Sequence, residues 1–131
     1  GNKTKEALVR PIIKDVMPLI RMAMELSSTE YLLDGKDGKP MSRGTFSWYP
    51  RSLIIWCKKR GYDMSYWSIH DLRRTGRTHL SRLTTADVAE IILGHTLPGV
   101  RMTYDRHDYL EEQATAYKAW FDKVQNIITQ D

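Results

Sequence analysis

The chain has 131 residues, a length that suits a single domain able to bury a hydrophobic core. It carries 20 Lys and Arg residues against 16 Asp and Glu residues, and the net charge of +4 is compatible with a polyanionic partner without requiring one. Its single cysteine, Cys57, excludes a disulfide framework, and its apolar runs are too short to span a membrane, so we expect a soluble protein of the reducing cytoplasm.

The N-terminal third predicts one short strand, one helix and a loop. Residues 3–11 (KTKEALVRP) are basic and mildly apolar, which favours a strand or the second arm of a β-hairpin. From Lys14 to Ser27, apolar residues recur at i, i+3, i+4 and i+7 and predict an amphipathic helix. Tyr31 to Leu33 could form a short buried strand or extended segment, and the Gly, Asp and Pro residues of 34–40 predict a turn. We therefore expect a mainly α fold, α+β in class, with a small N-terminal β element.

Ser42 is predicted to cap a second helix that runs toward Arg60. Pro50 lies within this segment and should kink or divide it, because proline lacks a backbone donor. Four large apolar side chains are expected to face the core: Phe46, Leu53, Ile54 and Trp56.

The segment Ser68 to Leu83 (SIHDLRRTGRTHLSRL) predicts a helix with two chemically different faces. Ser68 is a candidate N-cap, with Asp71 three residues on in a capping-box pattern. The expected buried face consists of Leu72, Gly76, His79, Leu80 and Leu83, with His79 as a satisfied core histidine. The opposite face carries His70, Arg73, Arg74 and Arg77. One imidazole and three guanidiniums suit a phosphate, although a solvated basic face is the commoner explanation of such a run.

Two further helices are predicted. One begins at Thr84 or Thr85 and ends at Gly94, so that His95 follows its C-terminus, where a capping role is the commoner one. The other covers about 109–128 and has a heptad-like seam made of Leu110, Ala114, Tyr117, Phe121, Val124 and Ile128. This seam suits docking either on the chain's own core or on a neighbouring subunit.

Three elements together resemble the signature of the tyrosine recombinases, the phage-integrase family: His70-x-x-Arg73, the ILGH run that ends at His95, and Tyr104 nine residues later. The runs HDLRRT, ILGH and YDRHDYLEE are most similar to integrases of prophages and genomic islands. The resemblance covers essentially the whole chain. It implies the helical C-terminal catalytic domain of an integrase, encoded by a bacterium or phage and associated with the nucleoid.

The resemblance also implies a reaction and a role for each matched residue. Tyr104 attacks a DNA phosphodiester, forms a 3′-phosphotyrosine link and releases a 5′-hydroxyl, without a cofactor or a metal. Arg73 clamps the phosphate, His70 is the general base or proton relay, and His95 donates a hydrogen bond to the phosphate. Lys3, on the N-terminal β element, protonates the leaving 5′-oxygen.

Residues near these positions are alternatives to them or candidates for binding DNA. Lys5 is the alternative to Lys3, and Tyr109 is the fallback nucleophile, while the family spacing does not select His107. Arg74 and Arg77 are expected to bind flanking DNA phosphates, which position a duplex without reading its sequence.

The family's first catalytic arginine lies upstream of the hairpin lysine, and no arginine of this chain matches it. We therefore expect residues 1–131 to be a single, N-terminally truncated catalytic domain that is inactive alone. The expected partners are double-stranded attachment sites, a homotetramer assembled on DNA through the C-terminal helix, and accessory DNA-bending or excision factors. The alternative function is a non-catalytic DNA-binding or assembly module.

Overall fold

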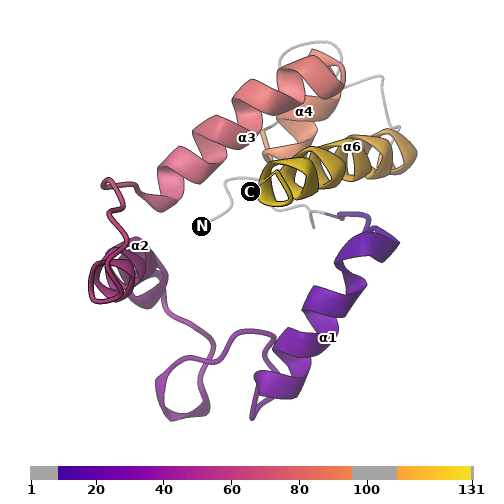
Figure 1. The fold of residues 1–131 in the computed structure, drawn as a ribbon. Coiled ribbons are helices and arrows are strands. Elements are labelled where there is room, and N and C mark those ends of the chain that lie inside the picture. Colours follow the sequence, from indigo (N-terminus) through magenta and orange to yellow (C-terminus); the bar gives the residue numbers. More distant parts are fainter. Residues whose placement is uncertain (1–8, 96–108, 131) are drawn as a thin grey trace. The chain divides into compact units, whose positions relative to one another are not determined.

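The computed structural model describes residues 9–95 and 109–130, and these residues are mainly helical (Figure 1). They form five α-helices and two short 3-10 helices, and their β structure is limited to one isolated bridge between Asp34 and Pro40. The mainly α prediction is therefore confirmed. The β element predicted over 3–11 stays a prediction at residues 3–8, which lie outside the described ranges, whereas Val9 to Pro11 have no regular secondary structure.

The chain divides into two compact units. One unit comprises Val16–Thr75, and the other comprises the residues before Val16 together with those from Gly76 onward. Helix α3 (Ile69–Leu83) passes through the boundary between Thr75 and Gly76. The single domain predicted over 1–131 stays a prediction.

Helix α1 (Met17–Leu26) follows a 3-10 turn at Lys14–Val16. Pro18 lies in its first turn, where a backbone N–H has no intrahelical acceptor, so that proline is well tolerated. The helix predicted from Lys14 to Ser27 is confirmed. None of the residues of α1 is buried, so the periodic pattern predicted the helix but not a buried face in the described part of the chain.

The segment between α1 and the next α-helix is a loop, with a 3-10 turn at Lys36–Gly38. The buried strand suggested for Tyr31 to Leu33 is wrong, because these residues are exposed and carry bends rather than a strand. Asp34 instead organises the turn. Its carboxylate accepts hydrogen bonds from the backbone N–H of Ser28 at 2.7 Å and from the hydroxyls of Ser27, Ser28 and Thr29. These bonds, the Thr29 hydroxyl first, lower the pKa of Asp34 to about 2.

This turn should lose its order only in strong acid. Because the pKa of Asp34 is lowered from 3.8 to about 2, its stabilising effect is complete above pH 3.8 and is lost as the pH falls through about 2. In an NMR titration, we expect the amide proton of Ser28 to titrate with a midpoint near pH 2. Asp34→Asn should remove this titration and Asp63→Asn should not. A Ser28 midpoint near 3.8 would contradict the hydrogen bonds to Asp34.

Helix α2 (Arg43–Lys58) begins as predicted. Ser42 is its N-cap, and the Ser42 hydroxyl oxygen accepts a hydrogen bond from the Thr45 N–H at 3.1 Å. Pro50 does not divide this segment, because one helix continues through it. Pro50 and Cys57 are the buried residues of α2.

Half of the core positions predicted for α2 are wrong. Leu53 and Ile54 are half-buried, but Phe46 and Trp56 remain 44% and 50% exposed. The guanidinium of Arg60 lies over the Trp56 ring, 3.8 Å from its centroid. This cation–π contact stabilises the Trp56 ring at the surface, although the ring is not buried in a core.

The other unit has a small core formed by α3, α4 (Ala86–Ile92) and α6 (Leu110–Ile128). Leu80, Ala89 and Ala116 form its buried cluster, and Ile92 packs against them. Figure 1 shows α4 beside α6, and the two helices are in contact. Alanine on both helices allows their backbones to approach closely. The N-terminal segment joins this unit through Arg10, whose Nη2 donates to the Ile91 carbonyl at 2.7 Å.

The predicted buried face of α3 is partly confirmed. Leu80 is 4% exposed, and Gly76, His79 and Leu83 are half-buried. Leu72 is 57% exposed, contrary to the prediction. The core is centred on Leu80, which lies about 12 Å farther along the helix axis at ~1.5 Å per residue. A helical period predicts which face is apolar, but not how far along the helix that face is covered.

Helix α6 confirms the C-terminal helix predicted at about 109–128, with Leu110 as its first residue. Most residues of the predicted seam are half-buried: Leu110, Ala114, Tyr117, Phe121 and Val124. Ile128 is 63% exposed, and the buried positions are Gln113 and Ala116. The innermost line of α6 is thus shifted by one position from the seam. Burial raises the pKa of Tyr117, with the charge of Arg10 acting in the opposite direction.

Candidate functional site

The candidate site begins at the N-terminus of α3, where Asp71 caps the helix. The backbone N–H and the hydroxyl of Ser68 both donate to Asp71 Oδ2, at 3.0 and 2.7 Å. The Ser68 hydroxyl, the Ser68 N–H and then Arg74 lower the pKa of Asp71. The Ser68 carbonyl accepts from the Asp71 N–H at 3.0 Å. The predicted helix start is confirmed, and His70 lies in the first turn.

The basic face of α3 is exposed along its first two turns. His70, Arg73 and Arg74 are exposed, and Arg77, one further turn along, is half-buried. All four residues lie within α3, and their spacing of i, i+3, i+4 and i+7 places them on one face of the helix, as predicted. Arg74 Nη1 lies 3.4 Å from Asp71 Oδ1, an exposed pair that contributes little to stability. His70, Arg73 and Arg74 belong to the unit Val16–Thr75, and Arg77 belongs to the other unit.

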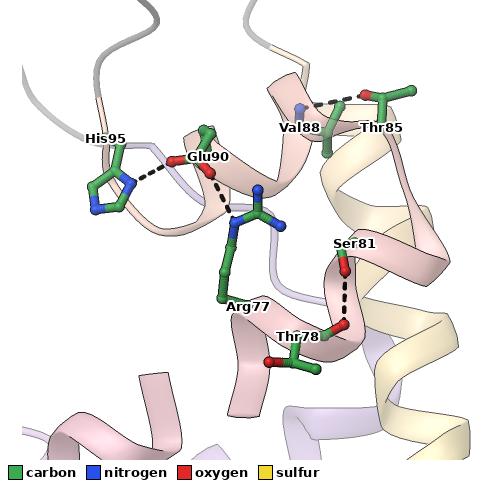
Figure 2. Close-up of polar contacts among 7 residues, drawn as sticks. All are labelled: Arg77, Thr78, Ser81, Thr85, Val88, Glu90 and His95. Carbon is green, nitrogen blue, oxygen red and sulfur yellow. Dashed lines mark hydrogen bonds and ion pairs between the residues drawn. The ribbon is translucent and has the colours of Figure 1, made fainter. Parts of the chain in front are cut away.

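Arg77 and His95 are joined by Glu90, a residue that the sequence patterns did not single out (Figure 2). Arg77 Nε donates to Glu90 Oε1 at 2.8 Å, and His95 Nδ1 forms a short hydrogen bond with Glu90 Oε2. We call these three residues the Glu90 bridge. The hydrogen bond from His95 and then that from Arg77 lower the pKa of Glu90, although partial burial acts in the opposite direction. The Glu90 side chain is therefore a carboxylate with one partner on each oxygen.

The end of α4 explains how Glu90 and His95 meet. Gly94 has a φ of 72°, a left-handed conformation that glycine adopts without strain. The Gly94 N–H donates to the Ile91 carbonyl at 2.8 Å, and the His95 N–H donates to the Glu90 carbonyl at 3.0 Å. This pair of bonds is a Schellman motif, which brings the residue after the glycine back over the residue five positions earlier. The same two residues then bond through their side chains.

The start of α4 is equally well defined. Thr85, rather than Thr84, is the N-cap, and its hydroxyl oxygen accepts from the Val88 N–H at 3.4 Å (Figure 2). Val88 and Ala89 are buried, while Ile91 and Ile92 are half-buried, so one face of this helix packs on the core. The N-cap, the buried face and the glycine C-terminus define the position of this short helix. They thereby also position Glu90.

His79 lies on the inner face of α3, as predicted, and stacks on Trp120 with ring centroids 5.0 Å apart. Its Nδ1 is buried and has no hydrogen-bond partner among the described residues, so the expectation of a satisfied histidine is wrong. The stacking contact with Trp120 of α6 orients the ring. His79 is a packing residue of the core.

The other predicted site residues cannot be placed beside these. Lys3, Lys5, Tyr104 and His107 lie outside the described residues, so their roles stay predictions. Tyr109 is described: it precedes α6, is half-buried and has a φ of 54°. The structure thus brings Arg77 and His95 together through Glu90 and places the other three basic-face residues on the exposed turns of α3.

Within residues 9–95 and 109–130, no group of three or more His, Cys, Asp or Glu side chains is placed to bind a metal ion. None of the helices in these ranges has the length and apolar character needed to cross a bilayer. No family model, curated protein or solved structure matches the chain. The site's own geometry and the sequence motifs therefore carry the functional argument.

Proposed function

We propose that this chain is the catalytic part of a tyrosine site-specific recombinase that integrates and excises a prophage or genomic island. It cuts and rejoins DNA through a 3′-phosphotyrosine intermediate. The observation that carries the proposal is the exposed pair His70 and Arg73, one turn apart on α3, followed in sequence by His95 at the glycine end of α4. A guanidinium can stabilise the charge that develops in phosphoryl transfer, and an imidazole can move a proton.

The chemistry follows from these residue types. The Tyr104 oxygen forms a bond to phosphorus while the bond to the 5′-oxygen breaks, and negative charge develops on the non-bridging oxygens. Arg73 stabilises this charge through a planar guanidinium that can donate two parallel hydrogen bonds. Tyrosine has a reference pKa of about 10 and needs a base, the role assigned to His70. Lys3 protonates the leaving 5′-oxygen, and His95 contacts the phosphate.

Arg74 and Arg77 are proposed to hold DNA phosphates on either side of the reacting one. Arg74 is well suited to this, because its side chain is 74% exposed and its nearby carboxylate, Asp71, is only a surface partner. Arg77 is partly occupied within the protein, because its Nε donates a hydrogen bond to Glu90. Its remaining guanidinium N–H groups are the ones that a phosphate would use.

A DNA-bound tetramer is the proposed assembly, with α6 as the contact between protomers. Ile127 and Ile128, in the last turn of α6, are exposed apolar residues and support docking of this end on a neighbour. Accessory DNA-bending or excision factors would act on the same assembly.

The test is covalent trapping on nicked DNA. The longest polypeptide in which these 131 residues are encoded is mixed with a pool of nicked duplexes of varied sequence, and DNA that stays attached after denaturation is recovered. We expect an adduct joined through a tyrosine to a 3′-phosphate, with a free 5′-hydroxyl on the other fragment. If no sequence yields an adduct, the recombinase proposal is wrong.

A non-catalytic DNA-binding module is the second candidate, and the exposed basic face of α3 favours it as well. For either function, the affinity of the 131-residue chain for duplex DNA should fall with salt. If Arg73, Arg74 and Arg77 each contact a phosphate, the log–log slope should be on the order of −3.

Binding curves at several salt concentrations provide the measurement. Arg73→Ala should make the slope shallower by about one, whereas Arg21→Ala on α1 should leave it unchanged. Binding that is independent of salt, or equal slopes for both variants, would remove the phosphate-binding argument. Salt-dependent binding without any covalent adduct would favour the module.

A further inference from the structure

The Glu90 bridge contains more hydrogen bonds than an isolated surface ion pair. Each carboxylate oxygen of Glu90 has its own donor, Arg77 Nε on Oε1 and His95 Nδ1 on Oε2. The Glu90 side chain is 29% exposed, and the backbone N–H of His95 is bonded to the Glu90 carbonyl. Glu90 therefore bonds both the backbone and the ring of His95, and its own carboxylate is oriented by the Arg77 guanidinium.

This geometry determines where the ring proton lies. A carboxylate can only accept hydrogen bonds, and the pKa of Glu90 is lowered by its hydrogen bond with His95, so Glu90 is the acceptor. Nδ1 must then carry the proton. A carboxylate bonded to one ring nitrogen of a histidine sets both the tautomer and the orientation of the ring.

We propose that Glu90 is a positioning residue that holds His95 in the Nδ1–H form and directs its Nε2 toward the reacting phosphate. This inference rests on the proposed recombinase function. It also restricts the role of His95. On a neutral ring in this form Nε2 is an acceptor, so His95 donates a hydrogen bond to a phosphate oxygen only as the imidazolium, with the carboxylate of Glu90 balancing its charge.

Arg77 has a second role in this arrangement. By bonding Oε1 it prevents rotation of the carboxylate, which keeps Oε2 on His95. Loss of Glu90 would release both Arg77 and His95, whereas loss of Arg77 would leave the contact with His95 in place but less well oriented. Any direct bond between the Glu90 carboxylate and Nδ1 favours the Nδ1–H form, so the role of Glu90 in positioning His95 for the reaction is measured by adduct formation.

The first experiment reads that tautomer without DNA. In the 131-residue chain, the ¹⁵N shifts of the two ring nitrogens of His95 are measured in alkaline buffer, and they show which nitrogen carries the proton. We expect the Nδ1–H form to predominate. Glu90→Ala should reduce its population, and the isosteric Glu90→Gln should also do so if the alanine variant does not fold. Glu25→Ala, which changes an exposed glutamate on α1, should have no effect.

An Nε2–H ring in the unaltered chain would overturn the inference, as would a ring population that Glu90→Ala and Glu90→Gln leave unchanged. Neither result depends on recombinase activity. Conversely, failure to trap any adduct would remove the recombinase proposal while the tautomer measurement would still stand.

The second experiment connects the tautomer with catalysis. In the trapping assay, Glu90→Ala should slow adduct formation by about 10- to 100-fold, the usual effect of removing a partner that orients a functional histidine. Because Glu90 acts through His95, adding Glu90→Ala to a His95→Ala variant should cause little further loss. Equal rates for Glu90→Ala and the unaltered chain, or full additivity with His95→Ala, would show that Glu90 does not act through His95.

Discussion

Replacement of Tyr104 by phenylalanine is expected to abolish the covalent protein–DNA adduct. Phenylalanine keeps the aromatic ring and removes only the hydroxyl oxygen, so the proposed nucleophile is lost with the smallest change of side chain. We expect adduct formation on nicked duplexes to fall by a factor of about 10⁴ or more, the scale observed when a catalytic nucleophile is removed. Duplex binding by the same variant should remain within about twofold of the unaltered chain, because the cations that bind phosphate are unchanged.

Tyr109→Phe is the matched control. Tyr109 is five residues from Tyr104, half-buried, and held at a φ of 54° immediately before α6. Such a left-handed conformation is uncommon for a residue other than glycine and fixes the backbone at the helix start. We expect Tyr109→Phe to retain the adduct. If Tyr109→Phe loses the adduct and Tyr104→Phe does not, the nucleophile is Tyr109 and not the residue that the family spacing selects.

The two variants also separate the two candidate functions. A recombinase and a DNA-binding module share the basic face of α3 and would show similar salt dependence. They differ in whether one hydroxyl oxygen is indispensable for a covalent product. An adduct that requires Tyr104 identifies an enzyme, whereas salt-dependent binding that is indifferent to Tyr104, with no adduct, identifies a module.

Local signals allowed the helices to be predicted closely. Ser42, Thr85 and Gly94 mark helix ends because a side-chain oxygen can accept an orphan N–H, and because glycine adopts a positive φ. The start of α3 was found in the same way, although the bonds run from Ser68 to the Asp71 carboxylate. These are interactions between residues a few positions apart, and sequence patterns record them.

Burial was predicted less well because it depends on what packs against a helix. Leu72 and Trp56 both lie at apolar positions of a helical pattern, yet both are exposed. Trp56 has an alternative partner in Arg60, a residue four positions away. Conversely, Gln113 is buried although its side chain is polar. No periodicity distinguishes these cases, because the coverage of a face comes from distant parts of the chain.

In the candidate site, too, local features could be predicted from the sequence, whereas contacts between helices could not. The motif residues of α3 and His95 were selected from the sequence, but Glu90 was not, since a glutamate near a helix end usually indicates an exposed face. A usable signal did exist. A helix that ends in Gly94 predicts a Schellman motif, and that motif pairs His95 with the residue five positions before it. Arg77 completes the bridge from another helix, which only the tertiary structure reveals.

Leu80→Ala should strongly destabilise the unit that holds the Glu90 bridge. Leu80 is 4% exposed and packs with Ala89 and Ala116, whose side chains are too small to move into the space that it leaves. The cavity would therefore persist, and we expect the free energy of unfolding to fall by about 2–5 kcal/mol. Total stabilities of domains are about 5–15 kcal/mol, so this loss is substantial.

Leu72→Ala is the matched control, because it makes the same substitution on the same helix at a residue that is 57% exposed. It should change the free energy of unfolding by less than about 1 kcal/mol in a urea titration followed by circular dichroism. Similar losses for the two variants would mean that Leu80 is not the centre of this core. A selective loss at Leu80 would show that packing of α3 on α4 and α6 sustains the part of α3 that carries Arg77. The Glu90 bridge should then weaken in Leu80→Ala under conditions in which Leu72→Ala leaves it intact, because Arg77 reaches Glu90 only while α3 and α4 remain packed.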